Sequence, residues 1–222
     1  MIKFKLNYRT YTIPQRFTIE QYEEIQKADP NEYKGWAKIM SVAIGIPIHR
    51  VLLCDEESLR LGAALILNEI NSMVEYKVKD FTKFNFGQFI DLDVYMVGGI
   101  DKNLDAILDM LCETRPKYID QAFWSLEQYR NFRISTYRSY AGLFGLNDNV
   151  EEEDGEENHD PNKVAKGWYQ VVVELSNDDP LKMDDITELP LRHALNFMSL
   201  RKEKAETEYN KQIHNDLQRR NR

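Results

Sequence analysis

The chain has 222 residues, of which 42% are hydrophobic and 30% charged, and its formal net charge is −8 at pH 7. This length fits one domain or two small ones and supplies enough apolar residues for a core. The negative balance argues against bulk binding of nucleic acid, because a polyanion requires a cationic face. No window holds the roughly 18 consecutive apolar residues of a membrane helix, and the N-terminus lacks the apolar segment of a signal peptide. We therefore expect a cytoplasmic protein, or one released by lysis.

The first eighty residues predict a small α+β unit, 1–80. Ile2–Leu6 alternates apolar and charged residues, Asn7–Thr10 has the composition of a turn, and Tyr11–Ile13 predicts a return strand. A lone hairpin is marginal in water, so this one must pack on the helices that follow. Alternation in Met73–Val78 predicts a further strand that pairs with the hairpin.

Helix-start signals divide the rest of this unit into short helices. Thr18 and Gln21 have the spacing of a capping box, and Asp29–Pro30 marks a second start. Gly45 ends that second helix. The helix that follows Asp55 carries six apolar residues that predict a core-facing surface. They are Leu59, Leu61, Ala64, Leu65, Leu67 and Ile70.

Residues 81–146 predict a central helical unit that is rich in aromatic residues. Helical spacing begins at Phe86, a turn is expected at Gly98–Gly99, and an amphipathic helix follows. The longest helix of this part starts at Pro116 and is apolar on most of its sides. Such a helix needs partners on most sides, so we expect both flanking units to pack on it.

Residues 147–162 predict a flexible acidic loop. Eight of the thirteen residues from Asp148 to Asp160 are Asp or Glu, and none is aromatic. Such a segment buries too little apolar surface to offset the entropy of ordering it. It lacks the spaced ligands of a calcium-binding helix–loop–helix motif. A solvated loop is the prediction, and mimicry of a polyanion is the alternative.

Residues 163–222 predict a C-terminal helical segment. Its first helix is amphipathic, although the run Val171–Val173 leaves a strand open. Thr187 is the expected N-cap of the last helix, which is apolar in its first third and mostly charged afterwards. A free helix with so thin an apolar stripe gains little stability alone, so we expect this end to dock on another molecule. The stripe consists of Ala205, Tyr209, Ile213 and Leu217.

The fold class that follows from these patterns is mainly α. It combines a small N-terminal β-hairpin, several orthogonally packed helices and a long C-terminal helix. Cys54 and Cys112 lie far apart in the sequence, and we expect two buried free thiols.

No residue pattern predicts a catalytic, cofactor-binding or metal-binding site, so we do not expect an enzyme. His49 and Cys54 are five apart, which does not place them on one helix face, and no second pair has zinc-ligand spacing. Gly98–Gly99 lacks the surrounding glycines of a phosphate loop. Asp91 and Asp93 are two apart and point to different helix faces, so they do not form an acid–base pair.

Arginines alternate with aromatic residues on the helix after Pro116, a mixture that can stack nucleobases or form a protein contact. The net charge of −8 favours a protein contact or a core over nucleic acid. The second candidate surface is the last helix. The predicted partner-binding residues on these two helices are Trp124, Tyr129, Arg130, Arg133, Tyr137, Tyr140, Leu195, Met198, Tyr209 and Ile213.

Four segments resemble a known group of proteins. The start MIKFKLNYRTYTIPQRFTIEQYEEI is similar to that of the tail assembly chaperones of tailed bacteriophages. GWAKIMSVAIGIPIHRVLL resembles their helix, small-residue turn, Ile-Pro and second helix. FNFGQFIDLDVYM and LPLRHALNFMSLRKEKAE resemble segments of proteins encoded in phage structural-gene clusters. The chain is longer than a simple tail chaperone and departs from that pattern in its aromatic middle.

The resemblance implies binding to a partner protein in the assembling tail and no catalytic residues. The expected function is to bind a tail or baseplate component, for example the tape measure, and to cover its apolar surface until assembly. Two alternatives stay open: a permanent virion structural protein of the neck, tail or baseplate, and a nucleic-acid-associated or inhibitory phage protein. The expected location is the cytoplasm of the infected bacterium, or the virion, and a homo-oligomer is kept open.

Overall fold

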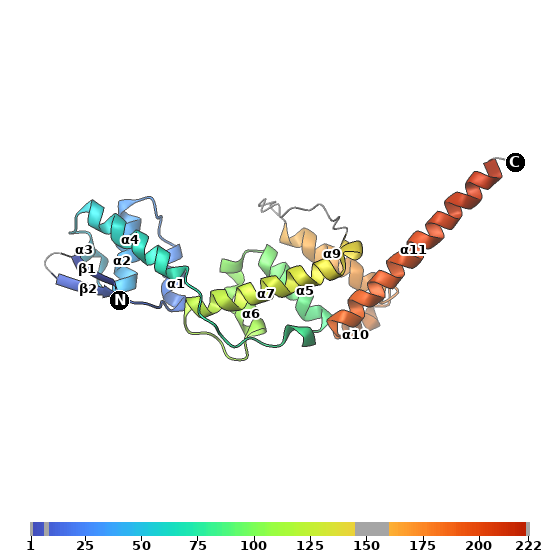
Figure 1. The fold of residues 1–222 in the computed structure, drawn as a ribbon, viewed down its shortest axis with the longest axis horizontal. Coiled ribbons are helices and arrows are strands. Elements are labelled where there is room, and N and C mark those ends of the chain that lie inside the picture. Colours follow the sequence, from blue (N-terminus) through green and yellow to red (C-terminus); the bar gives the residue numbers. More distant parts are fainter. Residues whose placement is uncertain (1, 7–8, 145–159, 221–222) are drawn as a thin grey trace. The chain divides into compact units, whose positions relative to one another are not determined.

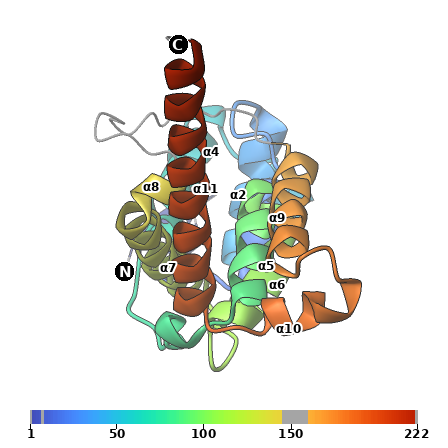
Figure 2. The same ribbon diagram turned by 90° about the vertical axis from the view of Figure 1, so that its right-hand side faces the viewer.

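A computed structural model describes residues 2–6, 9–144 and 160–220 (Figure 1; a second view is Figure 2). The described chain is mainly helical and carries a two-stranded antiparallel sheet near its N-terminus, so the predicted fold class is confirmed. The strands are β1 (Ile2–Leu6) and β2 (Arg9–Ile13), in a register that pairs Ile2 with Ile13. The return strand therefore starts two residues earlier than predicted.

Helices make up the rest of the regular structure, with short 3₁₀ turns η1 (Phe81–Lys83) and η2 (Pro180–Lys182) before α5 and α10. The α-helices are α1 (Ile19–Gln26), α2 (Tyr33–Ile44), α3 (Ile48–Val51), α4 (Glu56–Ile70), α5 (Phe86–Val97), α6 (Ile100–Leu111), α7 (Ile119–Ser139), α8 (Ala141–Phe144), α9 (Pro161–Leu175), α10 (Met183–Thr187) and α11 (Leu191–Arg220). The long C-terminal helix is thus confirmed, although it begins at Leu191. Thr187, its expected N-cap, ends α10 instead.

The chain divides into two compact units. Unit 1 consists of Met1–Lys79 and Leu111–Gln128, and unit 2 of Asp80–Met110 and Tyr129–Arg222. The first boundary lies next to the end of the predicted unit 1–80. The predicted central segment 81–146 forms no unit of its own, because its residues are shared between units 1 and 2. The predicted acidic loop 147–162 falls largely on 145–159, outside the described residues.

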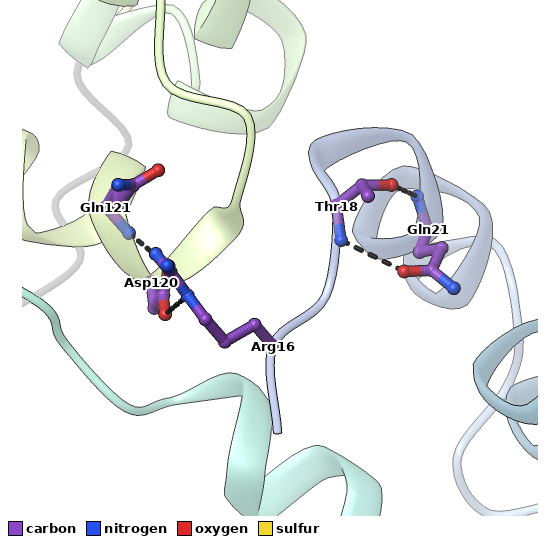
Figure 3. A network of polar contacts seen from close by, with 5 residues as sticks. All are labelled: Arg16, Thr18, Gln21, Asp120 and Gln121. Carbon is purple, nitrogen blue, oxygen red and sulfur yellow. Dashed lines mark hydrogen bonds and ion pairs between the residues drawn. The ribbon is translucent and has the colours of Figure 1, made fainter. Parts of the chain in front are cut away.

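Unit 1 is built around α2, which packs against α1, α3, α4 and β2. Thr18 and Gln21 form the predicted capping box of α1, in which each backbone N–H donates to the other side chain (Figure 3). The expected start of α2 at Asp29 is wrong, since Glu32 is its N-cap. Gly35 is required there, because a Cβ at this position would lie 1.6 Å from the Asp29 carbonyl oxygen.

In the second half of unit 1 the predicted strand is wrong, and the predicted core face of α4 is confirmed for Leu59 and Ile70 but wrong for other residues. The Met73–Val78 segment is not a strand. Val78 forms an isolated β-bridge with Cys112, and the Val74 N–H donates to the Asp120 carbonyl at 3.2 Å. On α4 the buried face is Leu59, Gly62, Ala63, Ile66 and Ile70. Leu61, Ala64 and Leu65, which the sequence placed toward the core, are exposed. A helix that packs on one neighbour covers one face, and α4 is apolar on more than one.

An ion pair joins the segment before α1 to the first turn of α7 within unit 1 (Figure 3). Arg16 Nε donates to Asp120 Oδ2 at 2.6 Å, and a terminal nitrogen of Arg16 donates to Oδ1 at 2.7 Å. The hydrogen bond to Asp120 raises the pKa of Arg16 above its ordinary value. The Asp120 side chain is 3% exposed, so the carboxylate depends on Arg16 for its counter-charge.

The Arg16→Met variant tests this dependence. Because it leaves a buried carboxylate without a counter-charge, we expect the free energy of unfolding to fall by about 2 kcal/mol. Urea denaturation measures the change. The double variant Arg16→Met, Asp120→Asn is expected to lose less, since no buried charge remains. A single variant within about 0.5 kcal/mol of the parent would show that the pair does not stabilise unit 1.

Unit 2 has its core between α5, α9 and the first turns of α11. Asn85 and Gln88 form a capping box at the start of α5. Phe86 N–H donates to the Leu189 carbonyl at 2.8 Å and Leu191 N–H to the Phe84 carbonyl at 3.0 Å, which ties the starts of α5 and α11 together. The run that left a strand open, Val171–Val173, is helical. The buried side chains are Phe86, Phe89, Trp168, Val172, Leu175, Leu191, Ala194 and Leu195.

Candidate protein-interaction site

A buried carboxylate on α5 joins three helices of unit 2. Asp93 accepts hydrogen bonds from Arg133 and Tyr137 of α7 and from Trp168 of α9. Arg133 Nε lies 2.7 Å and the Tyr137 hydroxyl 3.0 Å from Asp93 Oδ1, while Trp168 Nε1 lies 2.8 Å from Oδ2. The Asp93 side chain is 5% exposed. Because all three donors converge on one buried group, the network fixes α5, α7 and α9 in one arrangement.

Burial and charge set the protonation states around Asp93. Burial raises the pKa of Tyr137, and the Asp93 carboxylate raises it further. Burial alone would lower the pKa of Arg133, but the fields of Tyr137 and Asp93 outweigh it and the pKa lies above its ordinary value. Arg133 is therefore a cation and Tyr137 a neutral donor at neutral pH. This arrangement stabilises the carboxylate and holds it in place.

One hydroxyl near this network has no hydrogen-bond partner. Among the side chains that the structure describes, the Tyr129 hydroxyl is the buried polar group left without one. The residue is 0% exposed, and burial raises the pKa of its hydroxyl well above the ordinary value, with Asp93 adding to the effect. The ring itself packs edge-on against Phe81, with 5.6 Å between the ring centroids. Tyr129 thus contributes its ring to the core at the cost of an unsatisfied hydroxyl.

The Asp93→Ala variant tests the role of the carboxylate. It leaves the half-buried Arg133 without its counter-ion, so we expect the free energy of unfolding to fall by about 3–5 kcal/mol. Asp91→Ala removes the same chemical group from the exposed side of α5 and serves as the matched control, with little expected change. Urea denaturation followed by tryptophan emission measures both. Equal effects of the two substitutions would contradict a special role for Asp93.

The Tyr129→Phe variant tests the unsatisfied hydroxyl. At neutral pH we expect the free energy of unfolding to stay equal or to rise by up to about 1 kcal/mol. Because the folded-state pKa is raised, the proton of Tyr129 favours the fold below the ordinary tyrosine value of about 10, and this contribution is lost as the pH rises above it. The variant should therefore lose less stability than the parent between about pH 10 and 12. Parallel losses in urea denaturation at pH 7 and 10.5 would contradict this.

An apolar groove of about 610 Å³ lies between α8, α9 and α11 in unit 2. Phe144 of α8, Val164 and Val171 of α9 and Met198 of α11 are among its lining residues. α8 lies beside α11, as the second view shows (Figure 2). An open apolar groove between helices is the shape in which an amphipathic helix of another polypeptide docks.

Two cations mark the rim of this groove on α11. Arg201 donates to the Glu174 carbonyl and to Asn177 Oδ1, and Lys202 Nζ donates to the Gly142 carbonyl. These acceptors are neutral oxygens, so they orient the two cations without cancelling their charge. Exposed Glu174 also lines the groove, so its charged lining residues, two cations and one carboxylate, leave an excess of one positive charge. The rim is therefore suited to a partner that carries carboxylates beside its apolar residues.

The apolar face of α11 continues beyond the core of unit 2. Met198 is half-buried at the groove, whereas every described side chain from Glu203 to His214 is exposed. Figure 1 shows α11 extending past α9 and α10 of its unit. At 3.6 residues per turn, the next apolar positions lie on the face that carries Leu195 and Met198. We call the groove together with Ala205, Tyr209 and Ile213 the α11 surface.

The structure does not gather the six predicted partner-binding residues between Trp124 and Tyr140 into one surface. For Tyr129 the prediction is wrong, because its side chain is fully buried. Arg133 and Tyr137 are half-buried and bind Asp93. The Tyr140 hydroxyl donates to Asn196 Oδ1 of α11 at 2.9 Å. Of the remaining two, Trp124 is half-buried in unit 1 and Arg130 is exposed in unit 2.

The four predicted partner-binding residues of α11 also differ in how far they are buried. Leu195 is 0% exposed within the core, so its predicted contact with a partner is wrong. Met198 lines the groove. Tyr209 and Ile213 are 64% and 41% exposed, which leaves both open to a partner.

Sequence reasoning missed Asp93 and Trp168, although a signal for Asp93 was present. Asp93 stands seven residues after Phe86 and four after Phe89, so helical spacing places it on the buried face. A lone carboxylate on a buried face requires a donor partner. The exposed side chains of α4, Leu61 and Leu65, were likewise missed as surface residues.

Three further features concern the cysteines, possible metal ligands and long apolar helices. Cys54 and Cys112 are both buried thiols, as predicted. Within residues 2–6, 9–144 and 160–220, no three His, Cys, Asp or Glu side chains gather as metal ligands would. The described helices include none that combines the length and apolar character needed to span a membrane. No family model, curated protein or solved structure matches the chain.

Proposed function

We propose that this protein binds another polypeptide through the α11 surface. The observation that carries the proposal is the apolar face of α11, which leaves the core at Met198, resumes at Ala205 after the cations Arg201 and Lys202, and continues through exposed Tyr209 and Ile213. A helical segment of this length is marginal in water by itself, so an apolar face on it is stabilised when a partner covers it. The groove at its base supplies a pocket for apolar anchors of that partner.

The partner we propose is a tail or baseplate component of a tailed phage, with the tape measure as the leading candidate. This part of the proposal is supported by the resemblance of four segments to tail assembly chaperones and phage structural proteins. The protein would cover apolar helical surface of the component in the host cytoplasm and leave when the tail assembles. It would act by binding and not as an enzyme.

Co-expression tests this function. The tagged chain is produced with the tape measure or a baseplate protein of the same phage, and co-purification is quantified. Because a buried charge opposes docking, we expect Tyr209→Glu and Ile213→Glu each to reduce co-purification at least about tenfold. Thr207→Glu introduces the same charge on the opposite side of α11 and is the matched control, expected to bind like the parent.

Two outcomes would overturn the proposal. If none of the tail and baseplate proteins co-purifies with the parent chain, the proposed partner class is wrong. If Thr207→Glu weakens binding as much as Tyr209→Glu, the α11 surface is not the docking site.

Removal of Glu203–Arg222 is expected to leave the unfolding transition of the rest unchanged, because the described side chains from Glu203 onward are exposed.

A permanent virion protein is the second candidate function, and the same α11 surface supports it equally. Mass spectrometry of purified particles separates the two, since a chaperone is absent from them. A nucleic-acid-associated role has less support, because Arg133 is committed to Asp93 and the net charge is −8.

A further inference from the structure

The charged residues beside the apolar face of α11 are arranged in a self-complementary order, in which cations come before Ala205 and carboxylates come after it. Arg201 and Lys202 precede Ala205, while Glu206 and Glu208 follow it. At 3.6 residues per turn, Arg201 and Glu208 lie on one side of the face and Glu206 lies on the other, while Lys202 lies near the middle of the face, in line with Tyr209. Both carboxylates are exposed, and both cations are held at the groove rim by neutral oxygens.

We propose that a second copy of this chain covers the α11 surface, with the two α11 helices paired antiparallel about a two-fold axis next to Ala205. In an antiparallel helix pair, flanking residues face the flanking residues on the same side of the partner helix. Arg201 then faces Glu208 of the second copy, and Lys202 faces Glu206. The midpoints of both pairs fall at residues 204–205, so one register satisfies all four contacts at once.

The same register also places the apolar residues. Counting 1.5 Å per residue from the axis, Tyr209 of the second copy lies at the level of Leu200, and Ile213 about one turn further toward Leu195. This is the stretch of α11 that forms the groove wall at Met198 and Arg201. Each α11 therefore places its exposed half along the groove of the other copy. Ala205 is small, so the two backbones can approach closely at the axis.

Charge favours this antiparallel order over a parallel one. In a parallel, in-register pair each flank faces the opposite flank of the partner helix, so Arg201 would face Glu206, but Glu208 would lie beside Ile213 without a cation. The two Lys202 side chains, which lie near the middle of the face, would meet in that pair, and like charges repel. The antiparallel pair is isologous, which means that the same patch serves both copies and the assembly closes as a dimer. The inference rests on the proposed function in one respect: the α11 surface is a docking surface. The dimer keeps that surface covered before the phage partner arrives.

Sedimentation equilibrium of the full chain over a range of concentrations tests the pairing. We expect a monomer–dimer equilibrium in the parent. Arg201→Glu and Glu208→Arg each turn two attractive contacts into repulsive ones, so each variant alone is expected to dimerise roughly tenfold more weakly. Glu203→Arg changes the same charge on the outer side of α11 and is the matched control, expected to dimerise like the parent.

An equimolar mixture of the two variants is the decisive sample. In the mixed dimer, the glutamate introduced at position 201 of one copy faces the arginine introduced at position 208 of the other. The unchanged Glu208 of the first copy faces the unchanged Arg201 of the second. Both contacts are attractive, so dimerisation is expected to return to within about threefold of the parent.

Recovery in the mixture also shows that neither variant was simply misfolded. A monomeric parent at every concentration, or a mixture no stronger than the separate variants, would overturn the pairing.

Cysteine crosslinking gives the direction of the helices. Ala205→Cys lies at the proposed axis and is expected to form a disulfide between copies under mild oxidant. Gln212→Cys is expected to form none, since two such residues lie about 22 Å apart along an antiparallel pair. A disulfide through position 212 would indicate parallel helices and contradict the proposal. Because these measurements use the chain alone, a failure of dimerisation is distinguishable from a failure to bind a phage protein.

Discussion

The buried Asp93 carboxylate is the interaction on which the arrangement of unit 2 depends. It accepts hydrogen bonds from Arg133, Tyr137 and Trp168, so α5, α7 and α9 can pack with a charge at their centre only in the arrangement that supplies these donors. An apolar residue at this position would permit several packings, whereas a buried charge penalises all but one. α9, which contributes Trp168 to the network, also forms one wall of the groove.

α11 passes through three environments, and the position of the groove sets where each begins. Its first turns are buried in the core, its middle forms the groove wall and the described remainder has no core to pack on. The apolar face runs through these three parts, interrupted between Met198 and Ala205 by the two cations of the groove rim, although the environment changes from core to solvent. An apolar face that continues past its own core is typical of a docking helix. The proposed binding of a phage protein and the proposed pairing with a second copy are two ways in which the same face would become covered.

Local sequence patterns predicted much of the fold but few features of the candidate site. The hairpin, the capping box at Thr18 and the buried thiols follow from neighbouring residues, and the sequence predicts them. Asp93 and its donors are 40 to 75 residues apart, and no local spacing reveals which donor meets which carboxylate. Aromatic content was also ambiguous: Tyr129 is equally compatible with a contact residue and with a core residue, and packing decides for the core. On α4, Leu61 and Leu59 are both apolar, and only the position of α2 shows which one is covered.

Amide hydrogen exchange along α11 tests the central claim most directly, namely that the outer half of this helix is stabilised by what covers it. In dilute solution of the chain alone, the account predicts strong protection through the buried turns up to about Met198 and fast exchange from Glu203 onward. Raising the protein concentration, or adding the phage partner, is predicted to extend protection past Tyr209. Uniform protection of α11 at high dilution, or fast exchange from Glu203 under every condition, would contradict the account.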